Sequence, residues 1–159
     1  MFHFLKGKNK EKCSLRTLQR KSSSAFRSPG SYLFEKILGD GFAVIPSEGK
    51  IYAPTDGEIA MVFDTLHAIT LTSSSGTEIL IHIGLDTVTL KGAPFTAHVA
   101  AGDQVKKGDL LMDVDLDKIT GAGLNTVTPV LICNTDDYEK ISLKKEGEVS
   151  LDEAVLSIS

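Results

Sequence analysis

Apolar and polar positions alternate along most of the chain in short runs that are separated by turn residues. In AVIPSEGKIYAPTDGEIAMVF (43–63), the segments Pro-Ser-Glu-Gly and Pro-Thr-Asp-Gly interrupt β-rich runs. Proline fixes φ and glycine permits positive φ, so both interruptions predict turns. Runs of the same kind are HAITLTSSSGTEILIHIG (67–84), FTAHVAAGDQVKKGDLLMDVD (95–115), TVTPVLICN (126–134) and EGEVSLDEAVLSIS (146–159). Short strands at this spacing predict an all-β fold, either an antiparallel β-sandwich or a flattened barrel.

Helical periodicity is almost absent from the pattern. Only DVDLDKITGAG (113–123) could form a helical turn or two, which Gly121 and Gly123 would end. We therefore expect at most short helical turns within the all-β fold.

The run TEILIHIGLDTVTL (77–90) is predicted to be one strand that is apolar on both faces and has His82 at its centre. A hairpin folded about Ser74 and Ser75 would bring His67 opposite His82. Cross-strand neighbours have Cβ atoms about 4.5–5.5 Å apart, so the two histidines are predicted to share one face. A lone histidine among apolar residues is usually a core residue, whereas a pair indicates chemistry.

Two kinds of chemistry suit a histidine pair. Imidazole is a zinc ligand and Asp86 could be a third ligand, but a companion His-x-His is absent. The other is phosphoryl transfer through a histidine nitrogen, because imidazole is largely a neutral nucleophile at neutral pH. That reaction requires positioning and hydrogen-bond donors to the phosphoryl oxygens. A second imidazole N–H would be one donor, and the hydroxyl of Thr65, two residues before His67 and so on the same strand face, would be another.

Charge is distributed unevenly along the chain. Residues 1–30 contain eight Lys or Arg residues and one acid, Glu11, for a net charge of +7, and the remainder has nine basic and 20 acidic residues, for −11. An acidic body argues against nucleic acid as a partner and suits a partner with a basic docking face. No apolar run approaches the roughly 18 residues of a membrane span, and the basic start lacks a signal-peptide core. With two cysteines, Cys13 and Cys133, the sequence predicts a cytoplasmic protein without a disulfide framework.

Five segments together carry a family resemblance: GDGFAVIP (39–46), IYAPTDGEIAMVFDTLHAITL (51–71), GTEILIHIGLDTVTLKGAPF (76–95), GDQVKKGDLL (102–111) and TPVLICN (128–134). They resemble the glucose-type EIIA component of the bacterial phosphoenolpyruvate-dependent sugar phosphotransferase system. The segment around His82 is the most specific of them. The resemblance extends from about residue 35 to the C-terminus, so we expect residues 35–159 to form an EIIA type 1 domain.

The resemblance implies a phosphotransferase component that acts as a phosphohistidine carrier. His82 would accept a phosphoryl group from the carrier protein HPr and donate it to the EIIB domain of an EIIB/EIIC sugar permease. The membrane would be reached only through that permease, and no cofactor or metal is implied. His67 would stabilise the phosphoryl oxygens, with Thr65 anchoring His67 and Asp86 meeting basic residues of the donor. Apolar docking residues around the histidines would be Phe63, Leu80 and Ile83.

Three alternatives stand beside this interpretation. A regulatory module that binds permeases or kinases without transferring phosphate fits the same resemblance. The segment HVAAGDQVKKGDLL (98–111) resembles half of a biotinyl or lipoyl carrier domain, but the lysine hairpin of those domains is absent. The motifs APTDG and HIGLD resemble a zinc metallopeptidase on a related β-fold, and the missing His-x-His counts against it.

Residues 1–34 depart from the family pattern, which normally opens with a pair of strands. A shift of the reading frame over residues 14–34 permits codons that encode a family-like segment, after which Glu35 resumes the pattern. We therefore hypothesise that this segment is a frameshifted translation, which the coding DNA would test. We expect residues 1–34 to be a disordered basic segment without a binding role. The sandwich would be weakened because neighbouring strands would lose their partners.

Overall fold

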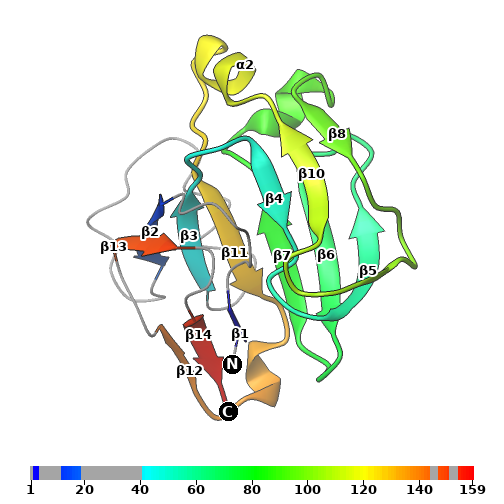
Figure 1. Ribbon diagram of the computed structural model, residues 1–159, viewed down its shortest axis with the longest axis vertical. Coiled ribbons are helices and arrows are strands. Elements are labelled where there is room, and N and C mark those ends of the chain that lie inside the picture. The colour runs from blue at the N-terminus through cyan, green and yellow to red at the C-terminus, as the bar shows by residue number, and fades with distance from the viewer. Residues whose placement is uncertain (1, 4–11, 19–40, 144–146, 151–153) are drawn as a thin grey trace.

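Three antiparallel sheets make up the structure, a computed structural model that describes residues 2–3, 12–18, 41–143, 147–150 and 154–159 (Figure 1). The largest sheet has eight strands in the order β13-β2-β3-β11-β7-β6-β5-β9. In that order their bounds are Gly147–Ser150, Lys12–Leu18, Gly41–Ile45, Thr128–Ile132, Glu78–His82, Ala68–Ser73, Gly57–Val62 and Gln104–Val105. The all-β expectation is confirmed.

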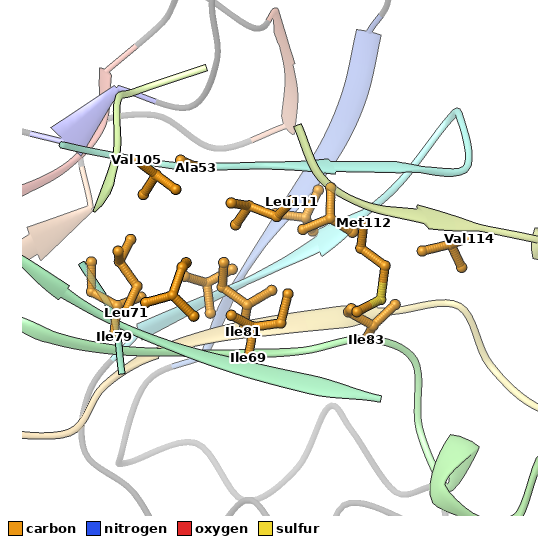
Figure 2. Close-up of a cluster of buried hydrophobic side chains, with 14 of the residues drawn as sticks. Ala53, Ile69, Leu71, Ile79, Ile81, Ile83, Val105, Leu111, Met112 and Val114 are labelled. Atoms are coloured by element: carbon orange, nitrogen blue, oxygen red, sulfur yellow. The ribbon is translucent and has the colours of Figure 1, made fainter. Parts of the chain in front are cut away.

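A smaller sheet packs against the large one to form a sandwich. Its strand order is β4-β10-β8, with bounds Lys50–Tyr52, Leu110–Val114 and Phe95–Ala97. Apolar side chains from the two sheets meet between them and form the main core. Figure 2 shows this layer, with Ile69, Ile79 and Ile81 of the large sheet on one side and Leu111 and Met112 of the small sheet on the other. A third sheet, in the order β1-β14-β12, comprises Phe2–His3, Ala154–Ile158 and Ile141–Leu143.

The two-residue period of the strands explains which side chains enter the core. In β6, Ile69 and Leu71 are 0% exposed and belong to the main core. On the outward face of the large sheet, a second small set of buried residues consists of Ala68, Leu80 and Leu131, and we call it the outer cluster. The large sheet is therefore apolar on both faces in this region, as predicted for the run that contains His82.

Helices are short in the described residues. The α-helix α2 (Leu116–Gly121) is capped by Asp115, whose side chain accepts a hydrogen bond from the backbone N–H of Lys118. This helix lies in the segment predicted to hold a helical turn. Two 3₁₀ turns, η1 (Thr87–Leu90) and η2 (Thr135–Asp137), were not predicted.

The strand predicted over residues 77–90 is wrong beyond His82, where β7 ends. Gly84 and Asp86 adopt left-handed φ angles of 75° and 59°, and η1 follows directly. A positive φ breaks the extended backbone, and glycine adopts it without a Cβ penalty. His82 consequently lies at the entrance to a turn, not at the centre of a strand.

Two short strands lie in the described part of the N-terminal segment. Residues 12–18 form β2, which pairs antiparallel with β3 from Ser14 opposite Ile45 to Leu18 opposite Gly41. Residues 2–3 form β1, which pairs with β14. Without β2, the backbone groups on that side of β3 would lack sheet partners, which is costly for a buried strand. The disorder expected for residues 1–34 stays a prediction, and most of these positions lie outside the described residues.

Candidate functional site

His67 and His82 lie together at one end of the hairpin formed by β6 and β7. Their ring centroids are 5.1 Å apart and the ring planes meet at 75°. The register differs from the prediction by one residue, because His82 pairs with Ala68. His67 instead precedes β6, and its carbonyl oxygen accepts a 2.7 Å hydrogen bond from the backbone N–H of Ile83. The two histidines therefore meet, although the predicted register is wrong.

A turn over residues 63–67 directs the ring of His67 toward the partner histidine. The N–H of Leu66 donates to the carbonyl of Phe63 at 2.7 Å, and Leu66 adopts a φ of 56°. Because this residue is left-handed, strand alternation does not decide the direction of the next side chain. Thr65 Oγ1 lies 2.5 Å from His67 Nδ1. The hydroxyl thus contacts His67 through the geometry of the turn, and not through a shared strand face as the sequence suggested.

A backbone carbonyl fixes the position of the proton on His82. Nδ1 of His82 lies 2.7 Å from the carbonyl oxygen of Gly84. A carbonyl oxygen can only accept a hydrogen bond, so Nδ1 carries the hydrogen. In the neutral ring, Nε2 then carries the lone pair. Nε2 is therefore the nitrogen that can act as a nucleophile.

Both histidines are held in their neutral form. Burial lowers the pKa of His82, against smaller opposing effects of the Gly84 hydrogen bond and the charge of Asp86. Burial also lowers the pKa of His67, and the neighbouring His82 adds to this effect. The lowered pKa values favour the uncharged form of both rings, which is the state that a nucleophilic imidazole requires.

The three predicted docking residues occupy different environments. Phe63 is half-buried against the outer cluster, with its ring centroid 5.4 Å from that of His67. Leu80 belongs to the outer cluster and is only 7% exposed. Ile83 is 1% exposed and lies in the main core, where Figure 2 draws it with Met112. The docking prediction for Ile83 is wrong, because this side chain points into the sandwich.

Two exposed apolar side chains in the described residues were missed by the sequence analysis. Met61 is 51% exposed and Val88 is 47% exposed. Met61 lies opposite Thr70 after a register shift in β5, and Val88 lies in η1. A bulge and a 3₁₀ turn both break the two-residue alternation, so the sequence pattern gives no signal for either exposure.

Asp86 is exposed at the start of η1, four residues after His82. Its backbone carbonyl accepts a 2.8 Å hydrogen bond from Thr89 Oγ1. Its carboxylate is close enough to His82 for its charge to act on the pKa of that ring. The structure therefore presents a negative charge at the surface beside the histidine pair.

No group of three or more His, Cys, Asp or Glu side chains in the described part of the chain is placed to hold a metal ion. His98 lies away from the pair, and its Nε2 is 2.6 Å from Asp113 Oδ2 on the small sheet. In the same described residues, no helix is long and apolar enough to cross a membrane.

Comparisons with known proteins place the chain in a family. Residues 28–138 match the family described as phosphoenolpyruvate-dependent sugar phosphotransferase system, EIIA 1. The chain is 45% identical to the glucose-specific EIIA component of Oceanobacillus iheyensis over 125 residues, which cover 79% of this chain and 76% of that protein. It is 48% identical to the beta-glucoside-specific EIIBCA component of Bacillus subtilis over 123 residues, which cover 77% of this chain.

The match covers only 20% of that second protein, so the chain spans about a fifth of the length of several curated relatives. Among solved structures, glucose permease IIA from Mycoplasma capricolum is similar, with a TM-score of 0.77 and 31% sequence identity. That comparison covers 98% of this chain and 92% of the other.

Proposed function

The chain belongs to the EIIA 1 family of the phosphoenolpyruvate-dependent sugar phosphotransferase system, and on that premise we propose that it carries a phosphoryl group on Nε2 of His82. The hydrogen bond from His82 Nδ1 to the Gly84 carbonyl carries the proposal, because it leaves the lone pair on Nε2. The domain that performs this role comprises residues 35–159.

The proposed reaction exchanges one nitrogen–phosphorus bond for another. The lone pair on His82 Nε2 attacks the phosphorus of the donor phosphohistidine, and the donor's N–P bond breaks with its electron pair returning to the donor nitrogen. The His82 ring gains positive charge, which the hydrogen bond from Nδ1 to the Gly84 carbonyl stabilises. In transfer to the acceptor, the sulfur of a cysteine of the EIIB domain attacks the phosphorus and forms an S–P bond, and the bond from His82 Nε2 to phosphorus breaks with its electron pair returning to Nε2.

His67 supplies a hydrogen-bond donor in this proposal. The hydrogen bond between the Thr65 hydroxyl and His67 Nδ1 is assigned with the hydroxyl as donor, so that His67 Nε2 carries a hydrogen. The His67 ring is adjacent to that of His82, and its Nε2–H donates to an oxygen of the phosphoryl group. Neutral His67 suits this task, since it needs one donor nitrogen and one acceptor nitrogen.

The proposed donor is the carrier HPr, and the proposed acceptor is the EIIB domain of an EIIB/EIIC sugar permease. The exposed carboxylate of Asp86 offers complementary charge to a basic donor face. The acceptor is supported by relatives named as EIIBCA and EIICBA components. The chain would then act in the cytoplasm and reach the membrane through the permease.

Transfer of labelled phosphate from phosphoenolpyruvate through enzyme I and HPr tests this function. Wild-type protein should take up acid-labile label, and His82→Ala should take up none. His67→Ala should retain label but pass it on poorly. His98→Ala is the matched control, because it removes an imidazole that contacts Asp113 on the other sheet. A folded wild-type chain without label would overturn the carrier function and favour a regulatory binding module.

A further inference from the structure

The carbonyl that orients His82 belongs to a peptide unit that is held at both ends. Its oxygen, on Gly84, accepts from His82 Nδ1 at 2.7 Å. Its N–H, on Leu85, donates to the backbone carbonyl of Asn125 at 2.8 Å. Hydrogen bonds connected in series through a peptide polarise one another. The hydrogen bond from Leu85 to Asn125 therefore fixes the direction of the Gly84 carbonyl from the opposite end of the same peptide unit.

Thr87 holds the peptide unit between Ile83 and Gly84, which precedes the unit between Gly84 and Leu85. Its side chain is 0% exposed, and Oγ1 donates to the carbonyl of Ile83 at 2.6 Å. The backbone N–H of the same Ile83 donates to the carbonyl of His67 at 2.7 Å. One residue thus connects the buried hydroxyl of Thr87 with the backbone of the second histidine.

The turn at Gly84 is closely packed by its neighbours. Gly84 has a φ of 75°, and a Cβ atom built on it would lie 2.5 Å from Thr87 Cγ2 and 3.0 Å from the Asn125 carbonyl oxygen. Thr87 and Asn125 therefore confine Gly84 closely. The methyl group of Thr87 restricts the position of the turn, while its hydroxyl restricts the direction of the peptides.

We propose that Thr87 is a positioning residue for phosphoryl transfer: its buried hydroxyl holds the turn that points the Gly84 carbonyl at His82 Nδ1, and so keeps the nucleophilic lone pair on Nε2. The consequence for transfer rests on the proposed carrier function. The effect on the His82 ring can be measured without any transfer, since nitrogen-15 NMR distinguishes the two neutral forms of imidazole.

Two substitutions separate the hydroxyl from the methyl group. Thr87→Val keeps the shape of the side chain and removes the hydroxyl, and Thr87→Ser keeps the hydroxyl. In Thr87→Val we expect a several-fold rise in the Nε2–H form of His82 and about tenfold slower phosphoryl uptake from HPr, the size of effect of one lost hydrogen bond. Thr87→Ser should retain the wild-type Nδ1–H form and most of the transfer rate.

Thr77→Val is the matched control. Thr77 is 1% exposed, and its Oγ1 lies 2.8 Å from the Tyr138 hydroxyl, at the opposite end of β7 from His82. Losing this buried hydroxyl should weaken the fold without changing the His82 ring. A shift in Thr77→Val equal to that in Thr87→Val would overturn the proposal, because general loosening would then explain both.

Other outcomes are equally decisive. A folded Thr87→Val with wild-type ring signals would overturn the proposal, and so would a Thr87→Ser that behaves like Thr87→Val. If Thr87→Val does not fold, Thr87→Ala compared with Thr87→Ser answers the same question. If the ring form depends on the Thr87 hydroxyl but the wild type takes up no phosphate, the positioning of His82 is supported and the carrier function is overturned.

Discussion

His67 and His82 bind protons more weakly in the folded protein than in the unfolded chain, because burial disfavours the charged ring. At pH values between the ordinary histidine pKa of 6.5 and the lower pKa values of the folded state, the unfolded state therefore binds more protons. The free energy of unfolding should fall as the pH drops through this window. It should stop falling for this reason once the pH is below the pKa values of the folded state. Urea denaturation at about pH 7.5 and about pH 5.5 would measure the difference.

The double variant His67→Gln, His82→Gln removes both groups and should show a weaker fall in stability between the two pH values. His98→Gln should keep the contribution of the pair, because His98 contacts Asp113 on the small sheet. A double variant with the same pH dependence as the wild type would mean that the pair does not have lowered pKa values.

The one-residue error in the hairpin register has a local cause. The Ser73 N–H donates to the Thr77 carbonyl and the Gly76 N–H donates to the Ser73 carbonyl, so the loop contains three residues. Gly76 has a φ of 89°, which is typical of three-residue hairpin loops. The alternation of apolar and polar residues does not define how many residues a hairpin loop contains. The histidines still meet because His67 lies in a turn outside the strand register.

At the scale of elements, η1 is one of the features that alternation could not predict, and it exposes Val88 just beyond Asp86. An exposed apolar residue two positions after an exposed carboxylate suits docking by a partner protein. We expect Val88→Lys to slow phosphoryl uptake from HPr roughly tenfold, since it places a cation against a basic donor. Stability should change by less than about 0.5 kcal/mol, as for most surface substitutions.

The control for this prediction is Ala101→Lys, which adds the same charge at an exposed turn residue of the segment between β8 and β9. Uptake rates at several salt concentrations would separate charge repulsion from lost apolar contact. Equal rates for Val88→Lys and wild type would exclude Val88 from the docking surface.

Over the whole molecule, the sequence predicts the strands and their class but not their order. The neighbours β5, β6 and β7 follow chain order and are joined by short turns, and the pattern marks the turn between β6 and β7. By contrast, β7 pairs with β11 and β11 with β3, between segments that no local turn connects. Such pairings depend on complementary faces brought together in the folded state, which a local pattern does not encode.

The role of β2 is the remaining question at this scale, because its residues fall within the segment predicted to be disordered. Leu15 pairs with Val44 of β3 on one side and with Gly147 of β13 on the other. Proline at this position removes a backbone donor from a strand paired on both sides. We expect Leu15→Pro to lower the free energy of unfolding by about 1–3 kcal/mol, the cost of an unsatisfied backbone group.

Hydrogen exchange of the backbone amides would locate this effect. Exchange should accelerate in Gly41–Ile45, which pairs directly with β2, more than in the β6–β7 hairpin, which β11 and β3 separate from it. Leu15→Ala keeps the N–H and serves as the control. If Leu15→Pro leaves both stability and exchange unchanged, β3 does not depend on β2. That result would favour a frameshifted segment without a structural role, whereas selective loss of protection in β3 would show that the written sequence supplies a working strand.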